Sequence, residues 1–174
     1  MTLGTAASGR SSRVGTAARL GRLAVAALVA TASLAPAPAR AQGADEQAVR
    51  AAVEHFLDLL GKRELGALPA LFAPKATMVV VRQRDGQWSH TVQTFDEWLA
   101  GLKAQTTVTR FREPLTNISV HVEDGQLAFL RADFTVEIDG QVRSHGVDYF
   151  TLVKDAGAWK LVNGSYTSKT GAPR

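Results

Sequence analysis

The 174-residue chain contains no cysteine. This absence excludes thiol catalysis, Cys-x-x-Cys redox chemistry and zinc sites built from thiolates. The four histidines, at positions 55, 90, 121 and 145, show neither His-x-His nor His-Glu-x-x-His spacing. No glycine-rich phosphate loop and no Gly-x-Ser-x-Gly motif is present. We therefore expect no metal site and no cofactor.

The chain also lacks an apolar run long enough to span a membrane, which requires about 20 residues. Its longest apolar run, "LAVAALVATASLA" at 23–35, follows four arginines and precedes Ala39-Arg40-Ala41. A basic start, a short apolar run and small residues before a cleavage site are typical of a secretory signal peptide. We expect residues 1–41 to be removed and residues 42–174 to be exported, to the periplasm or the medium, without a membrane span.

Acidic residues are absent before Asp45, so the positive charge of the whole chain comes mostly from the leader. Residues 1–41 hold five of the 20 Lys and Arg residues, which leaves 15 against 16 Asp and Glu, a net charge of 15 − 16 = −1. Such a balance gives no support for a nucleic-acid partner. The remaining 174 − 41 = 133 residues are enough for a single domain with its own core.

Apolar spacing predicts three helices and six strands. The helices are expected from Asp45 to about residue 64, over a short stretch that ends at Pro74, and from Thr94, where Thr94 and Glu97 have capping-box spacing. Tight-turn signals at residues 85–86, 124–125, 139–140 and 155–158 separate the strands into hairpins. Two helices, a hairpin, a helix and four strands predict an α+β fold with a mostly antiparallel sheet.

These segments resemble the nuclear transport factor 2-like (NTF2-like) superfamily, specifically its SnoaL-like branch, over residues 45–168. The resemblance rests on the paired helices, "ALPALFAPKAT", "TFDEWLAGL" and the ending "GVDYFTLVKDAGAWKLVNGSYT". It implies a cone in which a curved sheet wraps three helices and leaves a pocket at its open end. Superfamily members include isomerases, cyclases, dehydratases, hydrolases, transport factors and ligand-binding domains, so the resemblance predicts a fold better than an activity.

The turns also predict a strand register. If each turn contains two residues, Arg131, Asp148 and Ser165 share one layer on the pocket face, with Asn163 in the next layer. The opposite face would then hold Leu130 and Phe134, an apolar surface that predicts a homodimer. A β-bulge is the alternative, and it would move Arg131 and Asp133 to the outside.

Asp148 is the best candidate for a catalytic residue, because "DYFTL" resembles the strand that carries the oxyanion aspartate of ketosteroid isomerases. A neighbouring Arg131 would keep Asp148 ionised, which argues against that role and favours a structural ion pair at the pocket wall. His90 and Trp88 share a predicted strand face near the pocket mouth. The full predicted ligand-binding set is Arg131, Asp133, Asp148, Asn163, Ser165, His90 and Trp88.

Three functions are compatible with this pattern. The first is a domain that binds a small, largely apolar ligand with little or no catalysis. The second is an acid/base enzyme, of isomerase, cyclase or hydrolase type, on a cyclic or polyketide-like substrate. The third is a dimeric interaction module whose pocket is filled by its own side chains. A second titratable group near Asp148 would favour the enzyme, and Asp133 and His90 are the candidates for it.

Overall fold

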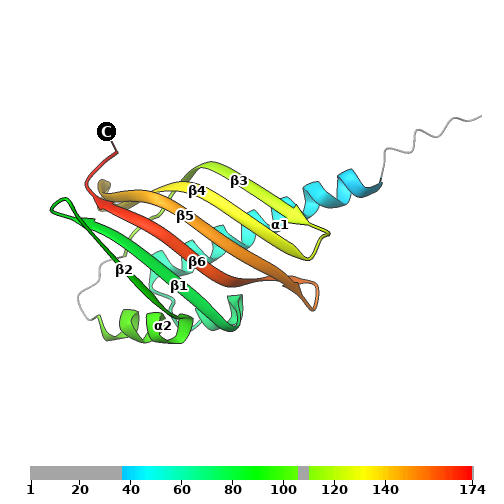
Figure 1. Ribbon diagram of the computed structural model, residues 1–174, viewed down its shortest axis with the longest axis horizontal. Coiled ribbons are helices and arrows are strands. Elements are labelled where there is room, and N and C mark those ends of the chain that lie inside the picture. The colour runs from blue at the N-terminus through cyan, green and yellow to red at the C-terminus, as the bar shows by residue number, and fades with distance from the viewer. Residues whose placement is uncertain (1–36, 106–109, 174) are drawn as a thin grey trace, which may run out of the picture. The chain divides into compact units, whose positions relative to one another are not determined.

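The computed structural model describes residues 37–105 and 110–173, which belong to the unit Ala35–Arg174. The predicted leader up to residue 36 lies outside the described residues. In chain order the elements are α1 (Ala37–Lys62), the 3₁₀ helix η1 (Leu68–Leu71), β1 (Phe72–Arg84), β2 (Gln87–Thr94), α2 (Phe95–Ala104), β3 (Leu115–Glu123), β4 (Leu127–Ile138), β5 (Gln141–Asp155) and β6 (Ala158–Thr170) (Figure 1).

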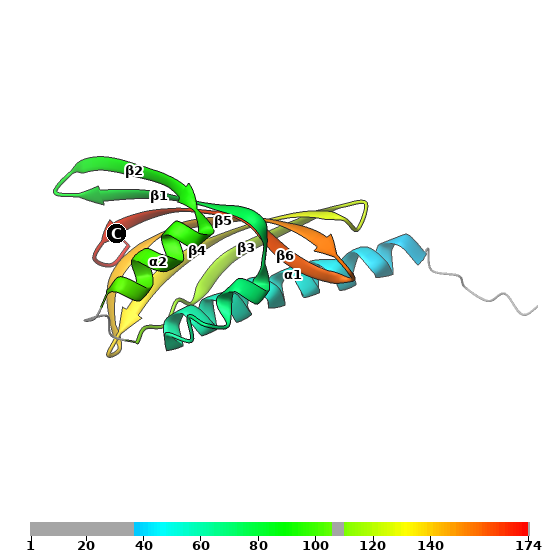
Figure 2. The same ribbon diagram turned by 90° about the horizontal axis from the view of Figure 1, so that it is seen from below.

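The six strands form one curved, open sheet in the order β2-β1-β6-β5-β4-β3. Neighbouring strands are antiparallel except for β1 and β6, which are parallel. Figure 2 shows α1 and α2 on the same side of the sheet. The predicted α+β class and the mostly antiparallel sheet of six strands are therefore confirmed.

Helix α1 packs an amphipathic face against the sheet. Val49, Val53 and Phe56 are almost completely buried, at the spacing that places them on one side of the helix. The helix begins at Ala37, eight residues before the predicted N-cap, and the Asp45 carboxylate pairs instead with the Lys154 ammonium group on β5. Among the described residues, no helix combines the length and the apolar character that a membrane span requires.

The prediction of a second α-helix is wrong. Residues 68–71 form only a 3₁₀ turn, with Pro69 in its first turn, and β1 begins directly after it at Phe72. The longer helix that was predicted would hold Pro69 in its interior, where proline removes a backbone hydrogen bond, and four residues are too few to gain stability from helix propagation. The described part of the chain therefore contains two α-helices rather than three.

Helix α2 begins as the sequence predicts. The Thr94 hydroxyl accepts a hydrogen bond from the Glu97 backbone N–H, and the Glu97 carboxylate accepts one from the Thr94 N–H, which completes a capping box. Phe95, Trp98 and Leu99 are buried. The cap therefore fixes where the helix starts and, with it, where Trp98 meets the sheet.

The predicted register is wrong in all three of the hairpins used to derive it, although each turn lies where it was expected. Asp139-Gly140 is a two-residue turn, but a bulge between Val136 and Glu137 then shifts β4 against β5 by one residue. A second bulge between Thr151 and Leu152 shifts β5 against β6. The turn between β3 and β4 contains three residues, because Glu123 pairs with Leu127.

A shift of one residue moves every side chain of a strand to the other face of the sheet. The bulged alternative is therefore the correct one for β4. Ala128, Leu130, Ala132 and Phe134 are at most 4% exposed and form part of the core under the helices. Leu130 and Phe134 thus cannot form the outer dimer surface for which they were predicted.

Candidate functional site

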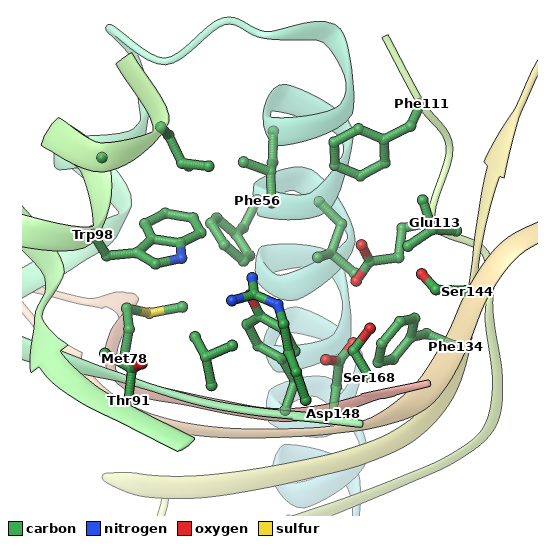
Figure 3. A pocket seen from close by; sticks show the side chains of 18 of the residues that line it. Phe56, Met78, Thr91, Trp98, Phe111, Glu113, Phe134, Ser144, Asp148 and Ser168 are labelled. Carbon is green, nitrogen blue, oxygen red and sulfur yellow. The ribbon is translucent and has the colours of Figure 1, made fainter. Parts of the chain in front are cut away.

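A cavity of about 480 Å³ lies between the two helices and the helix-covered face of the sheet. This volume is typical of pockets for small molecules. Its walls combine aromatic, aliphatic and polar side chains and come from α1, α2, the strands β1, β2, β4, β5 and β6, and the segment before β3 (Figure 3). The aromatic lining residues are Phe56, Trp98, Phe111, Phe134, Phe150 and Tyr166.

Asp148 lies on the cavity side of β5, next to Ala132 on β4 and Tyr166 on β6. Phe150, two residues further along β5, points to the same face and also lines the cavity. Asp148 is only 2% exposed and is the one buried charged residue among the described residues. One of its oxygens, Oδ2, has no hydrogen-bond partner. A buried acceptor without a partner is costly in a native protein, so Oδ2 is available to a bound molecule.

Glu113 brings a second carboxyl group into the same cavity. It lies in the segment between α2 and β3, which is tied to α1 by a hydrogen bond from the Phe111 N–H to the Gly61 carbonyl oxygen (3.1 Å). On its other side, Arg112 exchanges backbone hydrogen bonds with Glu137 of β4. Figure 3 shows the Glu113 side chain entering the cavity from this segment toward Asp148, which rises from the sheet.

The two carboxyl groups are close enough for each to change the pKa of the other. Burial raises the pKa of Asp148 to about 7, and the hydrogen bond from Glu113 lowers it somewhat. Burial also raises the pKa of Glu113 well above its usual range, and the charge of Asp148 and the hydrogen bond between them add to this increase. The pair therefore holds a proton near neutral pH.

Tyr166 places a hydroxyl group in the same cavity. Arg82 Nη2 donates a hydrogen bond to the Tyr166 hydroxyl oxygen at 3.0 Å, and the Arg82 guanidinium also lies 5.8 Å from the centre of the tyrosine ring. The Trp98 side chain lies close to the same hydroxyl. Burial raises the pKa of Tyr166 above its usual value, while Arg82 partly opposes this effect. The hydroxyl therefore remains protonated and can act as a donor.

The family of the chain follows from a match between residues 44–167 and a family model described as "Putative lumazine-binding". The chain belongs to this lumazine-binding-like family. Solved structures with NTF2-like and cystatin-like folds match as well, so the predicted NTF2-like fold is confirmed. The finer placement in the SnoaL-like branch stays a prediction.

Three solved structures illustrate the shared fold. An NTF2-like protein with a cystatin-like fold from Novosphingobium aromaticivorans is 17% identical, with a TM-score of 0.60 over 79% of this chain and 90% of that one. A "Putative Scytalone Dehydratase" from the same organism is 15% identical, with a TM-score of 0.58 over 75% and 87%. A protein with a cystatin-like fold from Nostoc punctiforme is 15% identical, with a TM-score of 0.58 over 72% and 91%. No curated protein matches the chain.

In this lumazine-binding-like domain, the predicted pair of Arg131 and Asp148 does not form. Arg131 lies on the outer face and pairs with Asp133, with 2.5 Å between Arg131 Nη2 and Asp133 Oδ1. Asn117 also donates a hydrogen bond to Asp133. These hydrogen bonds lower the pKa of Asp133, whereas the pKa of Asp148 is raised rather than lowered. The bulge between β4 and β5, in which β5 carries the extra residue Arg143, is the physical reason for both differences.

The other predicted site residues also lie outside the cavity lining. Asn163 and Ser165 hydrogen-bond to each other, and Asn163 also donates to the Thr77 hydroxyl on β1. His90 pairs with Val81 in the β1–β2 ladder, and both His90 and Trp88 are exposed at the edge of the sheet. Of the seven predicted residues, the structure places Asp148 in the cavity.

The sequence-based prediction missed Glu113 and Tyr166. Tyr166 was assigned to the outer face because the bulge in β6 was not foreseen. Glu113 lies in "FREPL", where Phe111 and Glu113 alternate before a proline. That alternation is a weak strand signal and does not indicate which strand the segment contacts. In residues 37–105 and 110–173, no group of three or more potential ligands is arranged to hold a metal ion.

Proposed function

We propose that this chain is a binding domain that takes a small, flat and largely apolar molecule into the cavity between its helices and its sheet. The observation that carries the proposal is an aromatic cavity of about 480 Å³ that contains a buried carboxylate oxygen, Asp148 Oδ2, without a partner. Apolar walls provide the driving force for binding, and a few placed polar groups provide orientation.

Membership of a lumazine-binding-like family supports the same function. An interaction module without a ligand would instead have its pocket filled by its own side chains. The cavity volume argues against that alternative.

The neutral fluorescent dye N-phenyl-1-naphthylamine provides a direct test. Its emission should increase in the presence of residues 42–174, because the dye exchanges water for an apolar cavity. Gly101→Leu should reduce this binding at least tenfold. Gly101 lines the cavity, and a Cβ atom added there meets nothing within 4 Å, so the larger side chain can enter the cavity without disturbing the helix.

The matched control is Ala100→Leu, one position earlier on the same helix. Ala100 is exposed and does not line the cavity, so the variant should bind the dye normally. Equal loss in both variants, or no dye binding by the unaltered chain, would contradict the proposal. Lumazine itself, a flat bicyclic dione, is the first natural type of ligand to test because of the family's description.

One observation favours the second candidate function, acid/base catalysis on a cyclic substrate. The Asp148 carboxyl has a pKa of about 7, which suits a group that must both accept and release a proton near neutral pH. Glu113 is the second titratable group near Asp148 that the enzyme hypothesis requires. The sequence had suggested Asp133 or His90 for this role, and neither residue lines the cavity.

Hydrogen exchange into a cyclic ketone distinguishes the two functions. An acid/base enzyme should accelerate deuterium incorporation into 2-tetralone in D₂O at pD 7, as followed by NMR, and Asp148→Asn should remove the acceleration. Dye binding that survives without any accelerated exchange would favour the pure binding domain. Asp133→Asn is the control, because Asp133 lies on the outer face.

A further inference from the structure

We infer that the ligand of this cavity is an amphipathic carboxylate, a molecule with an apolar body and one anionic head group, and that Arg82 binds the head group at the rim of the cavity. The inference rests on the proposed binding function and names the chemical class of its ligand. It follows from the way in which polarity and charge change along the cavity, from the residues deep under the helices to those at the rim.

The strand register arranges the floor of the cavity in rows of neighbouring residues across β1, β6 and β5. Side chains two residues apart on a strand point to the same face, so successive rows lie about 7 Å apart. From the inside outward, the rows are Met78-Gly164-Phe150, Val80-Tyr166-Asp148 and Arg82-Ser168-Gly146. The floor therefore changes from an apolar inner row, through a row with one carboxyl and one hydroxyl group, to an outer row with a cation.

The helices over the sheet change in the same direction. Phe56 and Leu60 of α1 are buried, whereas Arg63, directly after the end of α1, is half-buried and lines the cavity. Arg63 donates a hydrogen bond to the Leu102 carbonyl oxygen near the end of α2, at 2.7 Å. The C-terminal ends of both helices therefore lie at the same end of the cavity, which is its polar rim.

Arg82 is held with its charge directed toward the cavity. Its Nη2 atom donates a hydrogen bond to the Tyr166 hydroxyl oxygen at 3.0 Å, and its guanidinium lies 5.8 Å from the centre of the tyrosine ring. Tyr166 belongs to the middle row and lines the cavity. These contacts therefore direct the Arg82 side chain toward the ligand space, although the residue as a whole is exposed.

The Arg82 guanidinium has capacity left for an anion. A guanidinium presents its N–H donors in a planar fork that matches the two oxygens of a carboxylate. Among the described residues, Arg82 takes part in no ion pair, and the Tyr166 hydroxyl is its one side-chain acceptor. A cation at the rim of a binding cavity without an acidic partner is suited to a charge-assisted, bidentate contact with a ligand carboxylate.

The distribution of charge also sets the orientation of the ligand. Arg63 adds positive charge at the rim, since its hydrogen bonds go to backbone carbonyl oxygens rather than to a carboxylate. Asp148 lies one row deeper than Arg82, and the Glu113 carboxyl group points toward Asp148 (Figure 3). An anionic head group is therefore favoured beside Arg82 and disfavoured further in, so the apolar body must enter first.

The inner part of the cavity provides the apolar surface for that body. The Phe56 ring lies 6.1 Å from the Trp98 ring and 5.9 Å from the Phe150 ring, measured between centroids. From Arg82 to Met78 the floor extends over four residues of β1, about 13 Å. A fused ring system attached to the head group fits within this length and gains apolar burial against these rings.

The test uses three naphthalene compounds that share one body and differ in the head group: naphthalene-2-carboxylate, the neutral naphthalene-2-carboxamide and the cationic 2-naphthylmethylamine. Their displacement of N-phenyl-1-naphthylamine from residues 42–174 is measured at pH 7. The carboxylate should bind about tenfold or more tightly than the carboxamide, because the carboxylate alone forms an ion pair with Arg82. The amine should bind no more tightly than the carboxamide.

Arg82→Gln should reduce the ratio between the carboxylate and carboxamide affinities to less than about threefold. Arg82 is exposed, so the substitution should leave the fold intact. The matched control is Arg84→Gln, two residues further along the same strand. Arg84 is exposed and does not line the cavity, so the same loss of charge there should leave the ratio unchanged.

The outcomes separate this inference from the proposed function. Dye binding without a preference for the carboxylate, or with a preference for the amine, overturns the inference and leaves the binding function intact. A preference that Arg82→Gln leaves unchanged, or that Arg84→Gln removes equally, overturns the assignment of Arg82. Failure of the dye and all three naphthalene compounds to bind overturns both the inference and the proposed function.

Discussion

A carboxylate on the helix-covered face of a sheet is destabilised by burial unless a cation pairs with it. Asp148 has no such cation, since Arg131 lies on the other face. The carboxyl group instead shares a proton with Glu113 and keeps a raised pKa of about 7. A buried acid that retains one unsatisfied oxygen is costly for stability, and such groups are concentrated at binding and catalytic sites.

The first prediction concerns the pH dependence of stability. An unfolded aspartate has a pKa of about 3.9, and folding raises that of Asp148 to about 7. Between these values the folded state holds the proton and the unfolded state does not, so the free energy of unfolding decreases as pH rises through this window. Urea denaturation should show a loss of roughly 2–4 kcal/mol between pH 5 and pH 8 from this group.

Asp148→Asn should remove much of that loss, because the amide does not ionise, and the variant should be more stable than the unaltered chain at pH 8. Asp133→Asn is the contrast. Its partners lower the pKa of Asp133, so its contribution to stability is present at neutral pH and is lost only as pH falls through the lowered pKa. Equal pH profiles for the unaltered chain and Asp148→Asn would show that Asp148 is not the titrating group.

At the scale of elements, the site depends on how closely the segment before β3 approaches α1. Gly61 accepts a hydrogen bond from the Phe111 N–H, and a Cβ atom at Gly61 would fall within contact distance of the Phe111 carbonyl oxygen. A glycine is therefore required on α1, although it weakens the helix by about 0.5–1 kcal/mol relative to alanine. The contact holds the segment in which Glu113 lies two residues after Phe111.

The second prediction is that Gly61→Ala displaces this segment. Thermal or urea unfolding should show a loss of about 1–3 kcal/mol, which is typical of overpacking, and dye binding should weaken because Glu113 moves. Gly101→Ala is the matched helical control. A Cβ atom meets nothing within 4 Å there, so the variant should be as stable as the unaltered chain or more stable, by up to about 1 kcal/mol. A stable Gly61→Ala variant with normal binding would refute the role of this contact.

At the scale of the whole molecule, the outer face of the sheet remains uncovered within the described residues. Phe129, Tyr149 and Val92 are 45%, 55% and 66% exposed on it. The homodimer that the sequence predicts stays a prediction, and its surface is now this one rather than Leu130 and Phe134. An exposed face of this kind is suited to burial against a second copy through a two-fold axis.

The third prediction follows from that surface. Light scattering should show a dimer of residues 42–174 at micromolar concentration, and Phe129→Lys with Tyr149→Lys should convert it to a folded monomer. Charged substitutions at Leu130 and Phe134 should instead unfold the chain, because these side chains are 1% and 4% exposed. A monomeric unaltered chain would show that the face has another use or none.

The fourth prediction is export. N-terminal sequencing of the exported protein should begin at or near Gln42, because Ala39-Arg40-Ala41 forms the expected cleavage site. The first buried core residue among the described residues is Val49. Cleavage before Gln42 should therefore leave the packed part of α1 intact. Recovery of the full-length chain from the cytoplasm alone would contradict this prediction.

The sequence by itself determined the elements of this fold, because local signals specify them. The capping box at Thr94 and Glu97, the positions of the tight turns and the burial of one face of α1 are all local in origin. Together with the resemblance of these segments, they were sufficient for the α+β class and the NTF2-like fold. Asp148 could also be singled out, as a lone carboxylate in a strand that alternates for burial.

Only the tertiary structure decided which residues meet Asp148. Two bulges and a three-residue turn each change register by one residue, and each change exchanges the two faces of a strand. The local pattern of β4 was compatible with either face, so packing against the helices decided between them. Glu113 reaches the cavity because Gly61 allows its segment to approach α1, a contact between residues 50 positions apart along the chain. No local signal encodes such a contact, and it is the one that gives the site its second carboxyl group.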